Sequence, residues 1–204
     1  IKFSNCTFTS GLIDTNDGTV SGISFDSTCS LSYPVPTESC SYGLLVNVNN
    51  GTVENCSTAV VFDEEFKSLP KASVYFGGLV GQSFGKVKGC SNTGKFAIYI
   101  TAPATGTFYY FGGIIGYVEG KAGSIIVQNC TNEALVQVKY DTSCYFFTGG
   151  VVGGSKPIAT KQTESGNYGI IDGCVNRGKI QEFFTNGGSG SYPQVAGIIY
   201  SHEG

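Results

Sequence analysis

The stretch that decides the fold is GGLVGQSFGKVKGCSNTGKFAI at residues 77–98, together with GGIIGYVEGKAGSIIVQNCTNEALVQV at residues 112–138. Both begin with two glycines and two branched apolar residues, and both continue to an apolar, polar, Asn or Gly, Cys tetrapeptide. The glycine block recurs along the chain, with Gly11, Gly43, Gly78, Gly113, Gly150 and Gly197 taken as equivalent. A recurrence of about 35 residues is typical of repeat proteins built from stacked units.

The recurring tetrapeptide predicts a turn followed by a core position. Its third residue is Asn or Gly, the two types that enter the left-handed backbone region at least cost. The predicted turn residues are Asn5, Gly22, Asn55, Gly89, Asn129 and Gly173. The fourth residue is Cys in five copies and Ile23 in the other, so it is predicted to be an apolar core position that stacks thiols. The predicted thiol ladder is Cys6, Cys56, Cys90, Cys130 and Cys174. Scattered disulfides, foremost Cys29 with Cys40, are the alternative.

The strand pattern predicts an all-β chain. Residues 95–100 and 134–140 alternate with the two-residue period of a strand, and no segment has a helical stripe. Three short strands in each coil predict a right-handed parallel β-helix (β-solenoid) of about five coils, with loop insertions at the corners. We expect one domain, 1–204, divided into a cap or the end of a preceding coil (1–10), a divergent coil (11–42), four coils (43–77, 78–112, 113–149 and 150–196) and the start of a further coil (197–204).

The two quoted segments resemble the Glug repeat, in which GGLVG and a glycine turn precede G-x-I-x-N-C and a short strand. The resemblance extends over most of residues 40–200, although the coils here are longer than the repeat. It implies a parallel solenoid within a secreted or surface-attached bacterial protein. It implies no particular activity, since the repeat occurs in proteins of varied function.

Composition narrows the classes of partner. The chain has 204 residues, 30 of them Gly, and a net charge of −3 without a cluster of Lys and Arg, which argues against nucleic acids and anionic membranes. No apolar run is long enough for a membrane-spanning helix. With His202 as the single histidine and no C-x-x-C, we expect neither a metal site nor a cofactor. The start lacks Met and an apolar leader, so we expect a mature or excised piece.

Carboxylate pairs are the natural candidates for catalysis, because polysaccharide-cleaving enzymes need an acid and a base close together. The candidates are Asp63, Glu64 and Glu65 in one insertion, and Asp172 with Glu54, expected one coil apart on one face. The outward column that contains the second pair also holds Lys88 and Gln128, a mixture typical of a solvated face. We therefore predict no catalytic residues.

Aromatic triplets precede three successive glycine blocks, at 74–76, 109–111 and 145–147. Their common register predicts that Tyr75, Tyr110 and Phe147 stack on one face, and that Phe76 and Phe111 stack on the other. An outward aromatic strip would hold sugar rings or a protein, unless an insertion such as 63–73 covers it. Long insertions also predict a contact patch at one corner. Its candidate residues are Lys156, Lys161, Gln162 and Tyr168.

These observations favour a non-enzymatic, adhesin-like module at the cell surface or outside the cell, which binds a glycan or a protein through the aromatic strip and the corner loops. A structural subunit that stacks end to end is the first alternative, and a carbohydrate-active enzyme is the second. N-x-S/T triplets begin at Asn5, Asn50, Asn55 and Asn129, and these would be glycan acceptors in a eukaryotic source.

Overall fold

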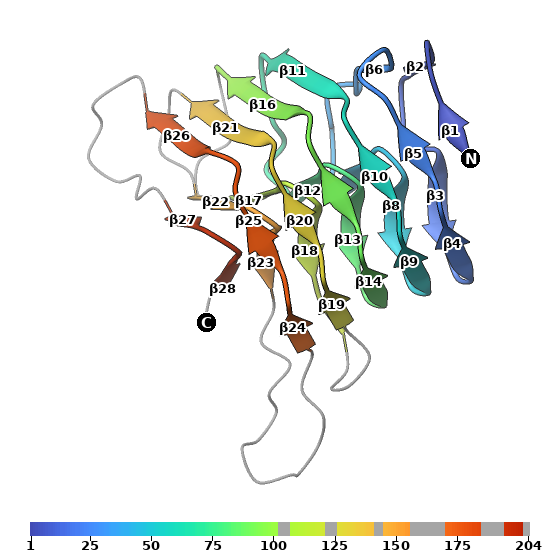
Figure 1. The fold of residues 1–204 in the computed structure, drawn as a ribbon. Coiled ribbons are helices and arrows are strands. Elements are labelled where there is room, and N and C mark those ends of the chain that lie inside the picture. Colours follow the sequence, from blue (N-terminus) through green and yellow to red (C-terminus); the bar gives the residue numbers. More distant parts are fainter. Residues whose placement is uncertain (102–106, 121–125, 141–144, 156–169, 185–193, 202–204) are drawn as a thin grey trace, which may run out of the picture.

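The computed structural model describes residues 1–101, 107–120, 126–140, 145–155, 170–184 and 194–201. Throughout these ranges the regular structure consists of β-strands that pair in parallel, each with the corresponding strand of the next coil. The strands form five sheets that run along the stack of coils, with the two chain ends at opposite ends of the stack (Figure 1). This arrangement confirms the predicted parallel β-solenoid.

Three sheets follow one another along the front wall of Figure 1, and they are joined by short turns. Sheet D contains β4 (Thr19–Ser21), β9 (Thr52–Glu54), β14 (Lys86–Lys88), β19 (Ile126–Gln128) and β24 (Ile170–Asp172). Sheet A contains β1 (Lys2–Phe3), β5 (Ser24–Phe25), β10 (Ser57–Thr58), β15 (Ser91–Asn92), β20 (Thr131–Asn132) and β25 (Val175–Asn176). Sheet B contains β2 (Thr7–Phe8), β6 (Ser30–Leu31), β11 (Val61–Phe66), β16 (Lys95–Ile100), β21 (Leu135–Tyr140) and β26 (Ile180–Phe184).

Two further sheets lie behind this wall. Sheet E contains β7 (Cys40–Gly43), β12 (Val74–Gly77), β17 (Phe108–Gly112), β22 (Tyr145–Gly149) and β27 (Gln194–Ala196). Sheet C contains β3 (Ile13–Asn16), β8 (Val46–Asn49), β13 (Val80–Ser83), β18 (Ile115–Val118), β23 (Val152–Ser155) and β28 (Ile199–Ser201). A coil thus runs through sheets C, D, A, B and E before it returns to sheet C.

The six predicted turn residues all have left-handed backbones. Their φ angles are 55° at Asn5, 66° at Gly22, 54° at Asn55, 59° at Gly89, 54° at Asn129 and 61° at Gly173. Five of them join sheet D to sheet A. Asn5 is different, because it lies between β1 and β2 and therefore joins sheet A to sheet B. The tetrapeptide at residues 3–6 has the same left-handed turn as the others but belongs to another corner of the coil.

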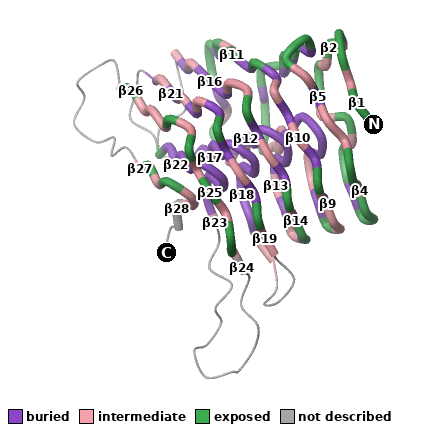
Figure 2. The backbone as a smooth tube through the Cα atoms, viewed as in Figure 1, coloured by how far each residue is buried: buried purple, intermediate pink, exposed green. Residues whose placement is uncertain are grey.

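The core lies between the front wall and sheets C and E (Figure 2). Side chains at equivalent positions stack in it coil upon coil, as Val53, Val87 and Val127 do without any exposed surface. Cysteines stack in the same way just beyond the left-handed turns. The observed ladder is Ile23, Cys56, Cys90, Cys130 and Cys174.

The predicted placement of Cys6 in that ladder was wrong. The amide of Ser30 donates to the carbonyl of Cys6 at 2.9 Å, and Thr7 pairs with Ser30. Cys6 therefore stacks with Cys29 at the corner between sheets A and B. The tetrapeptide at residues 3–6 is misleading because its left-handed turn joins sheet A to sheet B, whereas the turn of the other copies joins sheet D to sheet A. All described cysteines are free thiols, including Cys29 and Cys40, and Cys144 lies outside the described residues.

Glycines allow sheet E to turn directly into sheet C. A Cβ atom at Gly77, Gly112 or Gly149 would overlap the carbonyl oxygen three residues ahead, so no other residue fits this turn. Glycine also lets the two sheets approach closely, because a Cβ atom at Gly116 would lie 2.8 Å from the amide nitrogen of Phe76.

The predicted equivalence of Gly43 with Gly78 was wrong by one residue. Gly43 pairs with Gly77, so Leu44 occupies the position of Gly78 in its own coil. The sequence GLL at 43–45 has only one glycine where later coils have two, and alignment on that glycine shifts the register.

Candidate functional site

Outward aromatic side chains on sheets E and C form the most distinctive surface among the described residues. In sheet E, Tyr75 pairs with Tyr110 and Tyr110 pairs with Phe147, while Phe76 and Phe111 point into the core without exposure. The predicted stacking of the two columns is therefore confirmed. We use the name aromatic face for the outward set, which is Tyr75, Phe108, Tyr110, Tyr117, Tyr145 and Phe147.

Sequence reasoning missed three members of the aromatic face. Phe108 and Tyr145 begin β17 and β22, and they stack on each other with ring centroids 5.2 Å apart. Tyr117 comes from sheet C, and its ring centroid lies 4.6 Å from that of Tyr110. The two-residue spacing of Phe108 from Tyr110 was the available signal for the first pair. The contribution of sheet C requires the turn between the sheets, which no strand pattern reveals.

The rings of the aromatic face stack along the solenoid axis. Ring centroids are 5.4 Å apart for Tyr75 and Tyr110 and 4.9 Å apart for Tyr110 and Phe147, with interplanar angles of 30° and 15°. Tyr75 also stacks on Tyr117 at 4.8 Å. Each ring therefore covers much of its neighbour's face.

Exposure is uneven across the aromatic face. Tyr110 and Tyr117 are each 8% exposed, and Phe147 is fully buried. Phe108 and Tyr145 are 36% and 37% exposed. Burial, with the neighbouring Tyr75 second, raises the pKa of Tyr110 to about 12. Burial also raises the pKa of Tyr117, so both phenols stay protonated at physiological pH.

The insertion expected to cover the strip packs elsewhere. Residues 63–66 belong to β11, and Leu69 is buried in the main core. The hydroxyl of Tyr109, which points inward, donates to the carbonyl of Pro70 at 2.8 Å. This segment thus closes the core at the corner between sheets B and E. The predicted contact residues Lys156, Lys161, Gln162 and Tyr168 lie outside the described residues.

Residues that pair with one another from coil to coil form rows along the solenoid axis. The two rows that pass through Tyr110 and Tyr117 contain no charged residue among the described positions. The row in sheet E is Ser41, Tyr75, Tyr110, Phe147 and Gln194. The row in sheet C is Thr15, Val48, Gln82, Tyr117 and Gly154. By contrast, the outward row of sheet D is Ser21, Glu54, Lys88, Gln128 and Asp172, which we call the polar face.

Glu54 and Asp172 are too far apart to act as an acid and base pair. Glu54 and Asp172 are three coils apart, with Lys88 and Gln128 between them, so the expected spacing of one coil was wrong. Three coils correspond to about 14 Å. In the insertion, Asp63 forms an ion pair with Lys95 of the next coil. In the described part of the chain, no three Cys, His, Asp or Glu side chains gather into a group able to hold a metal ion.

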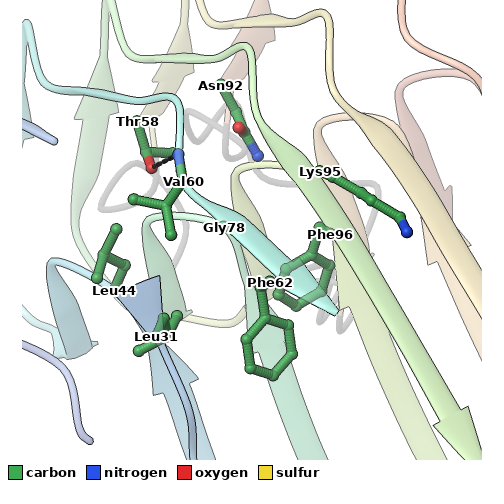
Figure 3. A pocket seen from close by; sticks show the side chains of 9 residues that line it. All are labelled: Leu31, Leu44, Thr58, Val60, Phe62, Gly78, Asn92, Lys95 and Phe96. Atoms are coloured by element: carbon green, nitrogen blue, oxygen red, sulfur yellow. Dashed lines mark hydrogen bonds between the residues drawn. The ribbon is translucent and has the colours of Figure 1, made fainter. Parts of the chain in front are cut away.

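Two hollows lie away from the aromatic face. A groove of about 260 Å³ runs over the outer side of sheet A. Its lining includes Asp26, whose pKa the hydroxyls of Ser4 and Thr28 hold far below the usual range, so this carboxylate is no proton donor. The other hollow is a small pocket of about 10 Å³ against the core, which has room for about one water molecule (Figure 3).

The small pocket lies in a coil that departs from the repeat. In later coils Asn92, Asn132 or Asn176 reaches the glycine backbone across the core, where Asn92 donates to the carbonyl of Gly113 at 2.6 Å. In the coil with Leu44, the equivalent residue is Thr58, and both line the pocket (Figure 3). A shorter side chain thus compensates for the added leucine, and the pocket is a feature of packing.

No family model, curated protein or solved structure matches the chain significantly. None of the described residues forms an apolar helix of the length needed to cross a bilayer.

Proposed function

We propose that this chain is a non-enzymatic binding module of an extracellular or cell-surface protein, and that it holds a protein partner on its aromatic face. The observation that carries the proposal is the stacked, partly exposed pair Phe108 and Tyr145 beside a buried aromatic cluster. Large apolar side chains that remain exposed beside one another on a rigid wall are typical of interaction surfaces.

Residue composition favours a protein partner. The centres of protein interfaces are enriched in Tyr and Phe and depleted of charge. The rows through Tyr110 and Tyr117 fit this description, because the residues around the aromatic side chains are all uncharged at the described positions. An acidic polysaccharide would need cations, and the described positions of these rows have none.

Ring geometry also favours a protein over a glycan. A sugar packs its apolar side flat against the face of an aromatic ring, but the rings here cover one another's faces at interplanar angles of 15° to 30°. Ring edges carry the positive part of the aromatic quadrupole, so they pack well against the faces of other aromatic rings in T-shaped contacts. We therefore infer a partner segment that presents aromatic and aliphatic side chains.

Selection from a random peptide library displayed on phage would test the proposal. The wild-type chain is the target, and the Phe108→Ser/Tyr145→Ser variant is used to remove peptides that bind elsewhere. Val61→Ser is the matched control, because Val61 is 52% exposed on sheet B. We expect peptides rich in aromatic and aliphatic residues whose affinity falls at least about tenfold for the double variant and stays unchanged for the control.

Two results would argue against the proposal. One is a set of peptides that bind the double variant as tightly as the wild type. The other is a glycan array on which the wild type binds a sugar while the library yields no binder. This result would favour a glycan over a protein as the partner. The end-to-end structural subunit predicts no ligand in either assay and filaments by electron microscopy.

A further inference from the structure

The thiol ladder brings four cysteines into register within one column of the core. The amide of each following residue donates to the carbonyl of the cysteine in the previous coil: Ser91 to Cys56 at 3.0 Å, Thr131 to Cys90 at 2.9 Å and Val175 to Cys130 at 2.8 Å. Cys56, Cys90 and Cys130 are buried, and Cys174 is half-buried. Paired positions on parallel strands lie about 4.8 Å apart, which falls within the Cα separation of about 4.4–6.8 Å that a disulfide spans, and the Cβ atoms must approach each other to about 3.8 Å when the bridge closes.

Neighbouring thiols already interact along this column. Each sulfur reaches back toward the preceding coil, where Cys90 Sγ lies 3.9 Å from the carbonyl oxygen of Val53 and Cys130 Sγ lies 3.7 Å from that of Val87. Hydrogen bonds between thiols lower the pKa of Cys56, through Cys90, and of Cys130, through Cys174. Contacts with Cys130 raise the pKa of Cys90 and Cys174.

We propose that the ladder closes into two disulfides between successive coils, Cys56 with Cys90 and Cys130 with Cys174, when the chain folds in the presence of a small-molecule disulfide. A column of four cysteines has only one complete pairing of neighbours, and this is it. A bridge between Cys90 and Cys130 would instead leave a lone thiol on either side. The inference is independent of the proposed partner, because these sulfurs lie in the core.

The same register holds for a third pair. Cys6 stacks with Cys29 at the next corner, where Ser30 donates to the carbonyl of Cys6 at 2.9 Å. Cys40 differs, since its partner in sheet E is Val74. We therefore extend the pairing to Cys6 with Cys29 and leave Cys40 as a thiol, which makes it the internal control.

Each bridge forms by two exchange steps. While the chain folds and the column is still open to solvent, the thiolate of one cysteine of a pair attacks one sulfur of the small disulfide and releases one small thiolate. The thiolate of the other cysteine then attacks the protein sulfur in this mixed disulfide, which forms the bridge and releases the second small thiolate. Two protons pass from the cysteines to the released thiolates, and the two electrons reduce the small disulfide. Cys56 and Cys90 are 1% exposed, so their bridge must close during folding or local opening.

Disulfide mapping of the full chain tests this inference. The reduced, unfolded chain is refolded with a mixture of oxidised and reduced glutathione, free thiols are alkylated, and a digest is mapped without reduction. We expect peptides that link Cys56 to Cys90, Cys130 to Cys174 and Cys6 to Cys29, with Cys40 alkylated. A higher urea midpoint of the oxidised chain than of the reduced chain should accompany these bridges.

Two variants sharpen the mapping. Cys174→Val should lose one bridge and leave Cys130 alkylated, with the other bridges intact; a branched apolar residue suits this column, where Ile23 already stands. Cys40→Ser should keep every bridge. If the refolded wild type has only alkylated cysteines, links Cys90 to Cys130, or links cysteines that are not neighbours in the column, the inference is wrong.

Discussion

The aromatic face and the polar face belong to the same coils, yet they differ in almost every outward residue. On sheet D the outward row alternates Glu54, Lys88, Gln128 and Asp172, whereas sheet E places Tyr75, Tyr110 and Phe147 one above another. Both rows have the same spacing from coil to coil along the axis. The repeat therefore determines which positions point outward, and the residue type at those positions decides whether a wall is polar or aromatic.

The two faces also differ in what supports them. Beneath the aromatic face, sheet E turns into sheet C through glycines that have no room for a Cβ atom. At the edge of the polar face, the turn residue Gly22 has a left-handed backbone, but a Cβ atom added there would meet no other atom within 4 Å. A side chain added at the glycine turn should therefore disturb both sheet E and sheet C. A side chain added at Gly22 should disturb only that turn.

Gly112→Ala should give the largest effect. Its new methyl group would overlap the carbonyl oxygen of Ile115, so the turn beneath the aromatic face must open. We expect a loss of more than about 4 kcal/mol in the free energy of unfolding, measured by urea denaturation. Gly22→Ala is the matched control, for which left-handed strain alone predicts about 1 kcal/mol. Equal losses in the two variants would contradict the difference between the turns.

Tyr110→Ala should give the next largest effect. Tyr110 packs against Tyr75, Tyr117 and Phe147, so its removal leaves a void in the centre of the aromatic face. We expect a loss of about 3–4 kcal/mol in the free energy of unfolding. Lys88→Ala on the polar face should change it by less than about 0.5 kcal/mol. A loss below about 1 kcal/mol for Tyr110→Ala would mean that the cluster is not packed as described.

Substitutions at Leu44 and Thr58 should give a smaller effect. They test whether the two side chains compensate for each other in the core beneath these faces. Leu44→Gly and Thr58→Asn would each disturb the coil, the first by removing core volume and the second by crowding Leu44. The double variant rebuilds the Asn and Gly pair of the later coils. We expect a favourable coupling of about 1–2 kcal/mol in a double-mutant cycle of unfolding free energies. Additive losses would show that the two positions do not compensate for each other.

Glu182 should give the smallest effect, and one that depends on pH. It lies inside the last described coil, where Tyr140 donates to it at 2.8 Å and Thr148 at 3.4 Å, and the backbone of Gln194 also faces it. Burial raises the pKa of Glu182 from 4.5 to about 7. Because the folded chain holds the proton more tightly than the unfolded chain, the contribution of Glu182 to stability is greatest below pH 4.5 and falls as the pH rises to 7.

Replacement of Glu182 with Gln should remove this pH dependence. The amide keeps an acceptor for Tyr140 and carries no charge, so the variant should be more stable than the wild type at pH 8 by about 1 kcal/mol, since solvent screens the partly buried carboxylate, and similar to it at about pH 4. Urea midpoints at the two pH values provide the measurement. A wild-type midpoint that rises between these pH values, or a pH dependence that Glu182→Gln leaves unchanged, would contradict the assignment.

The solenoid and its turns could be predicted from the sequence because the same pattern recurs in successive coils. Asn55, Gly89 and Asn129 recur at one position, and only a left-handed turn explains why both residue types are accepted there. The first coil was misread for the opposite reason. One copy of a tetrapeptide, at residues 3–6, does not reveal which corner of the coil it occupies, and the hydrogen bond from Ser30 to Cys6 settles that only in three dimensions.

The aromatic face was only partly predictable. Alternation along a strand placed Tyr75, Tyr110 and Phe147 together, because the register of the glycine blocks extends to the residues before them. Exposure did not follow from the pattern. Phe147 is buried while Tyr145, two residues away on the same side of the strand, is 37% exposed, since burial depends on neighbours from other parts of the chain.

The most direct test of the central claim is hydroxyl-radical footprinting of the chain, alone and with a peptide selected on the aromatic face. In the free chain Phe108 and Tyr145 should be oxidised readily and Tyr110 slowly, in line with their exposure. The bound peptide should lower oxidation of Phe108 and Tyr145 and leave Val61 on sheet B unchanged. Protection of sheet D or sheet A instead, or a free chain in which Tyr110 reacts as fast as Tyr145, would contradict a partner site on the aromatic face.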